Sequence, residues 1–434
     1  MPERRSVITG LGLVTPAGIG VEEFGAALME GRPGVREISL FDASGFPCRV
    51  AGDLPDFSAR KYVPKSYRKS VKVMARDIEI AVAAADLAFR DAGLATRGVE
   101  EGEPVEFKRL GCNIGAGLIC TDLDELGMAV SQAVTDGRFD LRVWGQQGIE
   151  NLTPLWLLKY LPNMLACHVT IIHGCEGPSN NITCGSVSAH LSVMESIRWI
   201  ERDEADAAIA GGAESKLNAM GLLRQGLLGR LVTDANDRPG EACRPFDAGA
   251  TGTVIGEGGG LVILEEAGRA AGRGARVYAE VAGAGAACDP DGLRVTEPNV
   301  GSMDLAVRAA MDEAGVGPED IDCIVCQGNG VPAEDRLEAE AWHAALGDAA
   351  GRIPAFAVTG SIGSLFAGTG GPALAAGALA IRHGAVPPTV NCTSAAEGVG
   401  LNLSDRARPG EIRCVLTGAF ALGGQSGACV LRKV

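Results

Sequence analysis

Two short stretches in the middle of the chain, Cys243-Arg-Pro-Phe-Asp247 and Val254-Ile-Gly-Glu-Gly258, decide how the rest of the sequence is interpreted. The second stretch opens the apolar run Val254–Leu264, which predicts a buried strand. Both sit at a point where the pattern of small and apolar residues begins to resemble the pattern before it. Further predicted elements lie on both sides of these two stretches.

Strand patterns and helix patterns alternate on both sides of this point. Further strands are predicted at Val7–Leu13, Ala207–Ala210 and Val277–Val281, and helices at Ile78–Ala92, Leu305–Ala314 and Leu374–Ile381. Such alternation indicates an α/β fold whose sheets are buried on both faces.

The chain also contains a faint internal repeat. Ile209-Ala-Gly-Gly-Ala213 has a counterpart in Leu416-Thr-Gly-Ala-Phe420, and each is a strand that runs into small residues. The small-residue turns at Thr183–His190 and Thr359–Leu365 both lead into apolar helices. Two similar halves are therefore predicted, residues 1–255 and 256–434.

Composition excludes several classes of protein. The net charge of -15 disfavours binding to nucleic acid or to an anionic membrane. The 13 cysteines are scattered without a disulfide framework, which is typical of thiols in a reducing cytoplasm. We therefore expect a cytoplasmic protein without metal or structural disulfides.

Two local patterns have ordinary structural interpretations. Cys323 and Cys326 form a C-x-x-C within an apolar run, but no second pair completes a zinc site, so buried strand thiols are expected. Residues 353–381 carry no charge over a length that could span a bilayer. Pro354 and Pro372 interrupt that run, which favours a buried strand, loop and helix over a membrane segment.

Six stretches, in this order along the chain, resemble the β-ketoacyl synthase family over roughly residues 5 to 433. They are Val7-Ile-Thr-Gly-Leu-Gly12, Ala210-Gly-Gly-Ala-Glu214, Cys243-Arg-Pro-Phe-Asp247, Val254-Ile-Gly-Glu-Gly258, Arg273-Gly-Ala-Arg276 and His383-Gly-Ala-Val-Pro-Pro-Thr-Val-Asn391. The resemblance implies a duplicated thiolase-type fold of five layers, α-β-α-β-α, and an obligate dimer. It also implies condensation of an acyl thioester with a malonyl thioester, both on acyl carrier protein.

The family's chemistry needs a cysteine nucleophile at a helix N-terminus, two histidines that stabilise the enolate, and a lysine. In this sequence the resemblance places Ser186 at the cysteine position and Thr359 at the lysine position. Gln327 and Ser364 stand at the two histidine positions. Leu422, followed by Gly423, replaces the phenylalanine that gates the acyl pocket, and both are expected to contact substrate. All four catalytic side chains are therefore predicted to be inactive.

The joint loss of these groups resembles one subgroup, the chain-length factor or β subunit of type II polyketide synthases. Val331-Pro332 and Asp335-Arg-Leu-Glu-Ala-Glu-Ala341 resemble a stretch of those subunits. Ser186 and Thr359 depart from the subgroup, which commonly carries glutamine and lysine there. The resemblance implies a non-catalytic subunit that pairs with an active ketosynthase in polyketide or fatty-acid synthesis.

A basic cluster stands out in this acidic sequence: Arg60, Lys61, Lys65, Arg68, Lys69, Lys72 and Arg76. One interpretation is docking of the acidic carrier protein or of the partner subunit, centred on Lys65, Arg68, Lys69 and Lys72. The alternative is a solvated helix face.

Two further hypotheses remain open. The chain is an acyltransferase that uses Ser186 or Cys184 as a non-standard nucleophile, or it is a homodimeric acyl-binding or scaffold protein. Against the first, Ser186 suits a helix start and Cys184 is expected to be a buried structural thiol. His190, four residues after Ser186, is expected to pack in the core or face solvent. No cofactor is expected apart from the phosphopantetheine carried by an acyl carrier protein.

Overall fold

The computed structural model describes residues 4–291 and 301–434. Its main sheet runs in the order β10-β7-β11-β12-β1-β13-β19-β18-β14-β15. The first five strands are β10 (Ser179–Ile182), β7 (Leu110–Gly115), β11 (Ala207–Ser215), β12 (Glu257–Glu266) and β1 (Ser6–Thr15). The other five are β13 (Ala279–Cys288), β19 (Gln425–Arg432), β18 (Cys414–Phe420), β14 (Cys323–Cys326) and β15 (Ala355–Ala357).

The two groups of five strands have the same topology. Numbered along the chain, each group has the order 3-2-4-5-1, with strands 3, 2 and 4 parallel and strands 5 and 1 antiparallel to their neighbours. The groups join only where β1 pairs with β13, at Val7↔Glu280 and Ile8↔Ala279. The predicted duplication is thereby confirmed, and β11 and β18, which carry the two similar sequences, are the fourth strand of each half.

The predicted boundary at residue 255 is wrong. Strand β12 begins at Glu257 and pairs with both β11 and β1, so it completes the first sheet. The halves meet after Glu266, in the segment that carries α9 (Ala267–Gly272). The boundary predicted from the sequence lies too early because the glycine-rich motif before β12 resembles the end of a domain half. The pairing of β12 with β11 and β1 shows that this strand belongs to the first half.

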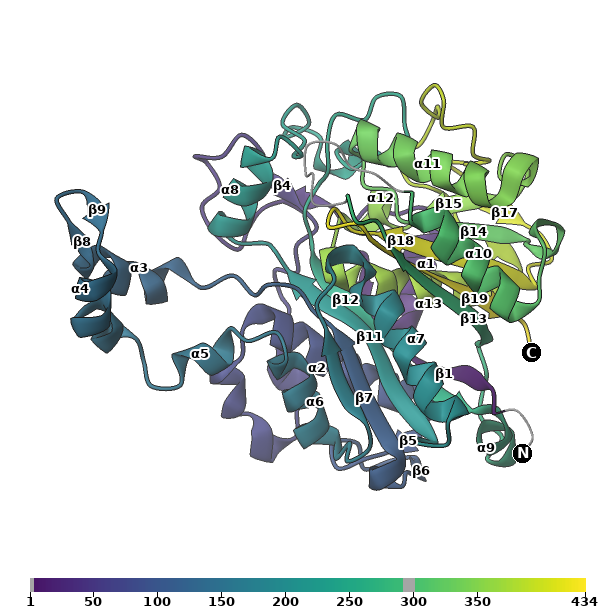
Figure 1. The fold of residues 1–434 in the computed structure, drawn as a ribbon, viewed down its shortest axis with the longest axis horizontal. Helices are drawn as coiled ribbons and strands as arrows, with labels where there is room; N and C mark the ends of the chain where they lie inside the picture. The colour runs from purple at the N-terminus through teal and green to yellow at the C-terminus, as the bar shows by residue number, and fades with distance from the viewer. Residues whose placement is uncertain (1–3, 292–300) are drawn as a thin grey trace.

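Helices cover and separate the sheets in five layers, as predicted (Figure 1). Helices α2 (Arg76–Ala92) and α6 (Met164–His173) cover the first sheet, and α10 (Met303–Ala314) and α11 (Pro332–Leu346) cover the second. Between the sheets lie α7 (Ser188–Glu201) and α13 (Gly370–His383), whose apolar side chains share one core with strands of both halves.

Shorter elements complete the chain, and most connect or cap the main layers. They are α1 (Val21–Glu30), α8 (Ala219–Leu227), α12 (Thr359–Ile362), β2 (Gly18–Ile19), β3 (Arg36–Glu37), β4 (Val50–Ala51), β5 (Leu94–Ala95), β6 (Glu103–Pro104), β16 (Ala385–Val386) and β17 (Arg408–Pro409).

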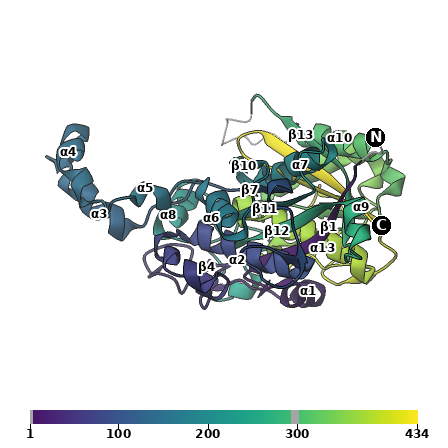
Figure 2. The same cartoon turned by 90° about the horizontal axis from the view of Figure 1, so that it is seen from below.

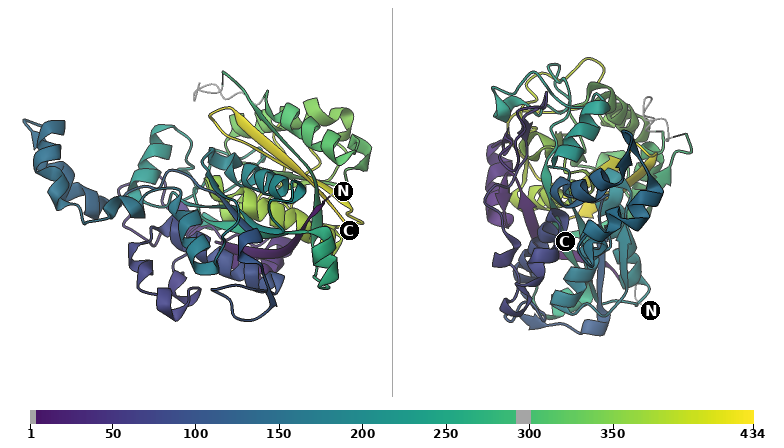
Figure 3. Two further views of the ribbon diagram at one scale, coloured as in Figure 1. Left: turned by 60° about the horizontal axis from the view of Figure 1, so that its bottom comes forward. Right: turned by 90° about the vertical axis from the view of Figure 1, so that its left-hand side faces the viewer.

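One insertion between β7 and α6 projects away from the body of the molecule (Figures 1 and 2). It carries α3 (Leu123–Gln132), β8 (Val134–Thr135), β9 (Arg138–Phe139), α4 (Leu141–Gln146) and α5 (Trp156–Lys159). We call residues 121–159 the arm. The left view of Figure 3 shows it extending away from the sheets.

Most sequence predictions of elements hold with shifted ends. Helix α2 ends at Gly93, which has φ +66° as a C-cap glycine should. The strand predicted at Val254–Leu264 begins at Glu257 instead, and that at Val277–Val281 extends to Cys288. Cys323 and Cys326 are buried free thiols of β14, as expected.

The uncharged run 353–381 forms β15, α12 and α13 within the body, as predicted. Within residues 4–291 and 301–434, no helix is long and apolar enough to cross a bilayer.

Close backbone approach explains the small residues of this fold. A Cβ atom added to Gly12 of β1 would lie 1.8 Å from the carbonyl oxygen of Ala84 in α2. The helix can therefore rest directly on the strand only where the strand has no side chain.

We expect Gly12→Ala to lower the free energy of unfolding by at least about 3 kcal/mol, because the added methyl meets a main-chain carbonyl that cannot move alone. Urea unfolding followed by circular dichroism measures this. Gly272→Ala in α9 is the control, since its Cβ meets nothing within 4 Å. A shift of the Gly12→Ala midpoint no larger than that of the control would contradict the packing described here.

Candidate active-site cavity

Ser186 lies at the turn that carries the chain from β10 into the central helix α7. A short 3-10 turn, Gly185–Val187, precedes the helix, and Gly185 adopts the left-handed backbone with φ +55°. The amide of Cys184 donates to Ser188 Oγ at 2.9 Å, which fixes the turn from inside. The left-handed residue is thus the glycine, and Ser186 is the half-buried residue after it.

Gln327 lies directly after β14, and its side chain is held in place. Its Oε1 atom accepts from the amide of Phe420 at 2.8 Å, and its own backbone amide donates to Glu338 Oε1 at 2.7 Å. Because the side-chain carbonyl is engaged, the Nε2 group is the part of Gln327 left to meet a ligand.

A cavity of about 340 Å³ joins these two residues. Cys184, Ser186 and Gln327 line it, together with Leu422 and Gly423 from the turn between β18 and β19. The structure therefore brings together, from both halves, the predicted nucleophile position, the first histidine position and the predicted acyl-contacting residues.

Thr359 and Ser364 do not line this cavity. The Thr359 hydroxyl is buried and donates to the carbonyl oxygens of Gln327 and Gly328, so it supports the Gln327 loop from behind. Ser364 is buried too, and its main chain bonds to Val254 and Gly256. Neither side chain is therefore placed to contact a ligand in the cavity.

Two carboxylates that match the family's motif serve the loop rather than the cavity. Asp335 accepts from the amides of Asn329 and Phe246, both at 2.7 Å, and Glu338 accepts from those of Gln327 and Gly328. Burial raises the pKa of both side chains to about 7, against backbone donors that lower it. Their function is to hold residues 327–330 in position.

A largely buried ion pair in the cavity wall was not predicted from the sequence. Arg230 binds Glu334 through two bonds of 2.7 Å, and a third donor of Arg230 reaches Gln225 Oε1 at 2.7 Å. Asn329 donates to the same carboxylate at 2.8 Å. The position of Glu334 next to the Asp335 motif could have marked it as a site residue. Arg230, however, lies 104 residues earlier in the chain, and only folding brings the two side chains together.

None of the five histidines lines the cavity. His190 is buried, the first of the two placements expected from the sequence, and it bonds Thr417 Oγ1 at 3.2 Å rather than Ser186. Burial lowers the pKa of His190 to about 4, so its imidazole is neutral at working pH. Among the described residues, lysine is absent from the lining as well, and Arg230 and Glu334 are the only charged residues there.

Cys184 is half-buried in the cavity wall rather than fully buried as predicted. Burial raises the pKa of its thiol above the ordinary value, and the nearby Cys288 adds to the effect. The thiolate, which is the nucleophilic form, is therefore scarce at neutral pH.

The basic cluster needs one correction. Arg60, Lys61, Lys65, Arg68, Lys69 and Lys72 are exposed, but Arg76 is only partly exposed and its charge is engaged within the fold. Its guanidinium binds Glu257 at 2.7 Å and the carbonyl of Leu54 at 2.7 Å, because it closes the N-terminal end of α2 onto the sheet. The first six residues are called the basic cluster below.

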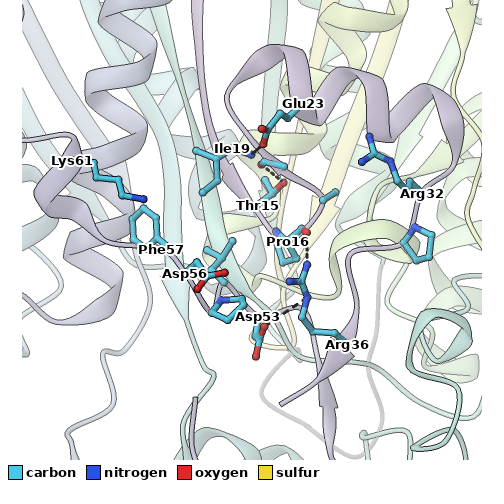
Figure 4. A pocket seen from close by; sticks show the side chains of 15 residues that line it. Thr15, Pro16, Ile19, Glu23, Arg32, Arg36, Asp53, Asp56, Phe57 and Lys61 are labelled. Atoms are coloured by element: carbon cyan, nitrogen blue, oxygen red, sulfur yellow. Dashed lines mark hydrogen bonds and ion pairs between the residues drawn. The ribbon is translucent and has the colours of Figure 1, made fainter. Parts of the chain in front are cut away.

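A separate hollow borders the basic cluster (Figure 4). Lys61 lines it, and Arg36 lies across it between the carbonyl of Pro16 at 3.2 Å and Asp53 at 3.7 Å. The hollow shares no lining residue with the cavity at Ser186.

Two family descriptions match most of the chain. "Beta-ketoacyl synthase, N-terminal domain" matches residues 3–270, and "Beta-ketoacyl synthase, C-terminal domain" matches residues 278–393. The chain belongs to the β-ketoacyl synthase family. The break between the two matches falls after β12, in agreement with the strand topology.

Relatives in this family include fatty-acid and polyketide proteins. The 3-oxoacyl-[acyl-carrier-protein] synthase 2 of Coxiella burnetii is 31% identical and covers 100% of both chains. The tetracenomycin polyketide synthase ketoacyl synthase beta subunit of Streptomyces glaucescens is 33% identical over 98% of each chain. The solved ishigamide ketosynthase/chain length factor is similar with a TM-score of 0.84 and 28% identity, over 100% of both chains.

We expect Cys184 to react slowly with iodoacetamide at pH 7.5, at least about tenfold slower than the exposed Cys288, because its raised pKa leaves little thiolate. Alkylation followed by peptide mass mapping measures both thiols in one sample. Since a raised pKa is titrated only at high pH, the rate at Cys184 should rise further above pH 8. A faster reaction at Cys184 than at Cys288 would indicate an activated nucleophile.

Proposed function

We propose that this β-ketoacyl synthase family member is a condensation-silent subunit, similar to a chain-length factor, that pairs with an active ketosynthase in polyketide or fatty-acid biosynthesis. The observation that carries the proposal is the cavity itself, which joins Ser186 to Gln327 without an imidazole, a lysine or an activated thiol.

The chemistry of the lining supports a silent site. A serine hydroxyl needs a general base, and the one carboxylate among the described residues of the lining, Glu334, is bound by Arg230. Gln327 can donate a hydrogen bond but cannot carry the positive charge of an imidazolium. Loss of such groups costs on the order of 10³-fold or more in rate.

Similarity supports the pairing with an active subunit. The tetracenomycin relative is named as a beta subunit, and the ishigamide structure is named as a ketosynthase together with a chain length factor. This chain keeps the motifs that hold its loops but lacks the reacting groups. It therefore suits an assembly in which a second, active subunit supplies those groups.

Intact mass spectrometry tests the silent site. After incubation with acyl-carrier and malonyl-carrier proteins, we expect no acyl adduct on this chain under conditions that load an ordinary ketosynthase fully. An adduct mapped to Ser186 or Cys184 would overturn the proposal.

Acyl transfer through Ser186 or Cys184 is the second candidate, because both side chains line the same cavity. If an adduct forms, Ser186→Ala and Cys184→Ala identify its site, since only the variant that lacks the nucleophile fails to load. If both variants transfer acyl groups at the rate of the unaltered chain, neither residue is the nucleophile.

Carrier-protein docking is the second part of the proposed function. The basic cluster presents six exposed cations on a protein of net charge -15, and no ion pair engages them among the described residues. Complementary charge steers association and fixes register, so an acidic carrier protein suits this surface. The phosphopantetheine on that carrier is the only prosthetic group that the proposal requires.

We expect Lys65→Glu/Lys69→Glu to weaken binding of an acyl carrier protein at least about tenfold at low salt, with a shallower salt dependence. Lys108→Glu/Lys433→Glu changes the net charge equally at exposed positions outside the cluster. Surface plasmon resonance against immobilised carrier protein compares them. Equal weakening by both pairs would mean that net charge, not the cluster, governs binding.

A further inference from the structure

Helix α8 presents leucines that do not pack into the core. All nine residues of this helix are described, and only Gly221 and Leu222 among them are buried. Leu223 and Leu227 are 47% and 79% exposed, and Leu228, directly after the helix, is 48% exposed. A surface helix usually carries polar side chains at its exposed positions, so these leucines indicate contact with an apolar group.

A pocket of about 550 Å³ lies between α8 and the segment that leads into β4 (Figure 1). We call it the α8 pocket, and its lining includes residues 46–48, Leu222, Leu223, Gly226, Leu227 and Leu231. It shares no lining residue with the cavity of about 340 Å³ at Ser186. Its volume lies within the range of about 300–1,000 Å³ that small-molecule sites occupy.

Hydrogen bonds fix both walls of the α8 pocket. On one side, Asn236 Nδ2 donates to the carbonyl of Pro47 at 2.8 Å, and Asn236 Oδ1 accepts from the amide of Arg49 at 2.7 Å. On the other side, the side chain of Asn218 caps α8 by accepting from the amide of Gly221 at 2.8 Å. The walls are therefore preformed, which reduces the entropy that a ligand must lose in ordering them.

Gly226 keeps space open within the α8 pocket. A Cβ atom added to Gly226 would lie 3.9 Å from Leu231 Cδ1, which is an ordinary contact. Close packing therefore does not require glycine here, although glycine is less favourable than alanine inside a helix. A larger side chain at this position would project into the pocket that the residue lines.

The exposed leucines are too few for a protein interface. At roughly 100 Å² of apolar area per leucine, Leu223, Leu227 and Leu228 expose about 170 Å² together. One side of a standard interface buries about 800 Å², a little over half of it apolar. A concave site with so little apolar surface around it suits a small ligand better than a macromolecule.

No charged side chain lines the α8 pocket within the described part of the chain. Its polar side chains are those of Cys48, Thr233 and Thr251, and Thr251 Oγ1 already donates to Asp234 at 2.8 Å. A charged ligand would lose hydration there without gaining an opposite charge. Leucine and phenylalanine side chains, by contrast, make dispersion contacts with hydrocarbon, so the lining suits a neutral apolar ligand.

We infer that the α8 pocket binds a neutral aliphatic chain. The inference goes beyond the proposed function, because it requires neither a silent site nor a partner subunit. Gln225 lines the cavity at Ser186, whereas the next residue, Gly226, lines the α8 pocket. A bound chain therefore contacts the helix that also forms part of the wall of the cavity at Ser186.

Isothermal titration calorimetry of the whole chain with hexanol, octanol and decanol, each with a terminal hydroxyl, tests the inference. We expect saturable binding whose affinity rises about fourfold for each added methylene, because each methylene leaves water for the apolar lining. Octanoate has a carboxylate on a chain of the same length and should bind at least about tenfold more weakly than octanol.

Two variants locate the bound chain. Gly226→Leu fills the pocket and should weaken octanol binding at least about tenfold, while leucine favours the helix. Leu227→Asp places a charge in the lining at a side chain 79% exposed, and it should weaken octanol binding by a similar factor. The matched controls are Gly272→Leu, where a Cβ meets nothing within 4 Å, and Leu305→Asp, at a side chain 58% exposed. Both controls should bind octanol as the unaltered chain does.

Leu422→Trp narrows the cavity at Ser186 and should leave octanol binding unchanged. Loss of octanol binding in this variant, with binding kept by Gly226→Leu, would place the chain in the cavity at Ser186 and overturn the inference. Octanol affinities of both α8 variants within threefold of their controls would overturn it too. No saturable binding of any alkanol, together with loss of carrier-protein binding in Leu227→Asp, would assign the leucines to a protein partner instead.

Discussion

Direct backbone contact between the first sheet and the segment that leads into α13 sets the geometry of this protein. A Cβ on Gly371 of α13 would lie 2.0 Å from the carbonyl of Gly260 in β12, and one on Gly212 of β11 would lie 2.2 Å from the carbonyl of Ala367. These distances are possible only without side chains, because protein interiors are packed without slack. The abundance of glycine and alanine is therefore a requirement of the five-layer architecture.

The position of the cavity follows from the same contact. Helix α7 enters the central layer directly after Ser186, while Gln327 leaves the second sheet directly after β14. Leu422 and Gly423 reach the same place from the turn between β18 and β19. The cavity is thus assembled from both halves of the chain.

The retained and the lost residues divide by physical role. Asp335 and Glu338 each satisfy main-chain amides in the interior, and their loss would leave buried donors without partners. The side chain of Gln327, by contrast, accepts a single hydrogen bond, from the amide of Phe420. A substitution at Gln327 would therefore leave fewer buried donors without a partner than a substitution at Asp335 or Glu338.

The sequence by itself determined the fold class, the family and the two-fold repeat, because ordered short motifs and the alternation of strand and helix are local properties. It also singled out Ser186, Gln327, Leu422 and Gly423 by their spacing from the motifs, and these four residues line one cavity in the structure. Tertiary structure decided the rest. Strand pairing assigned β12 to the first half, and the ion pair between Arg230 and Glu334 joined residues 104 apart. The exclusion of Thr359 and Ser364 from the cavity, the ion pair of Arg76 with Glu257 and the projection of the arm depend on contacts between distant segments, which no local pattern encodes.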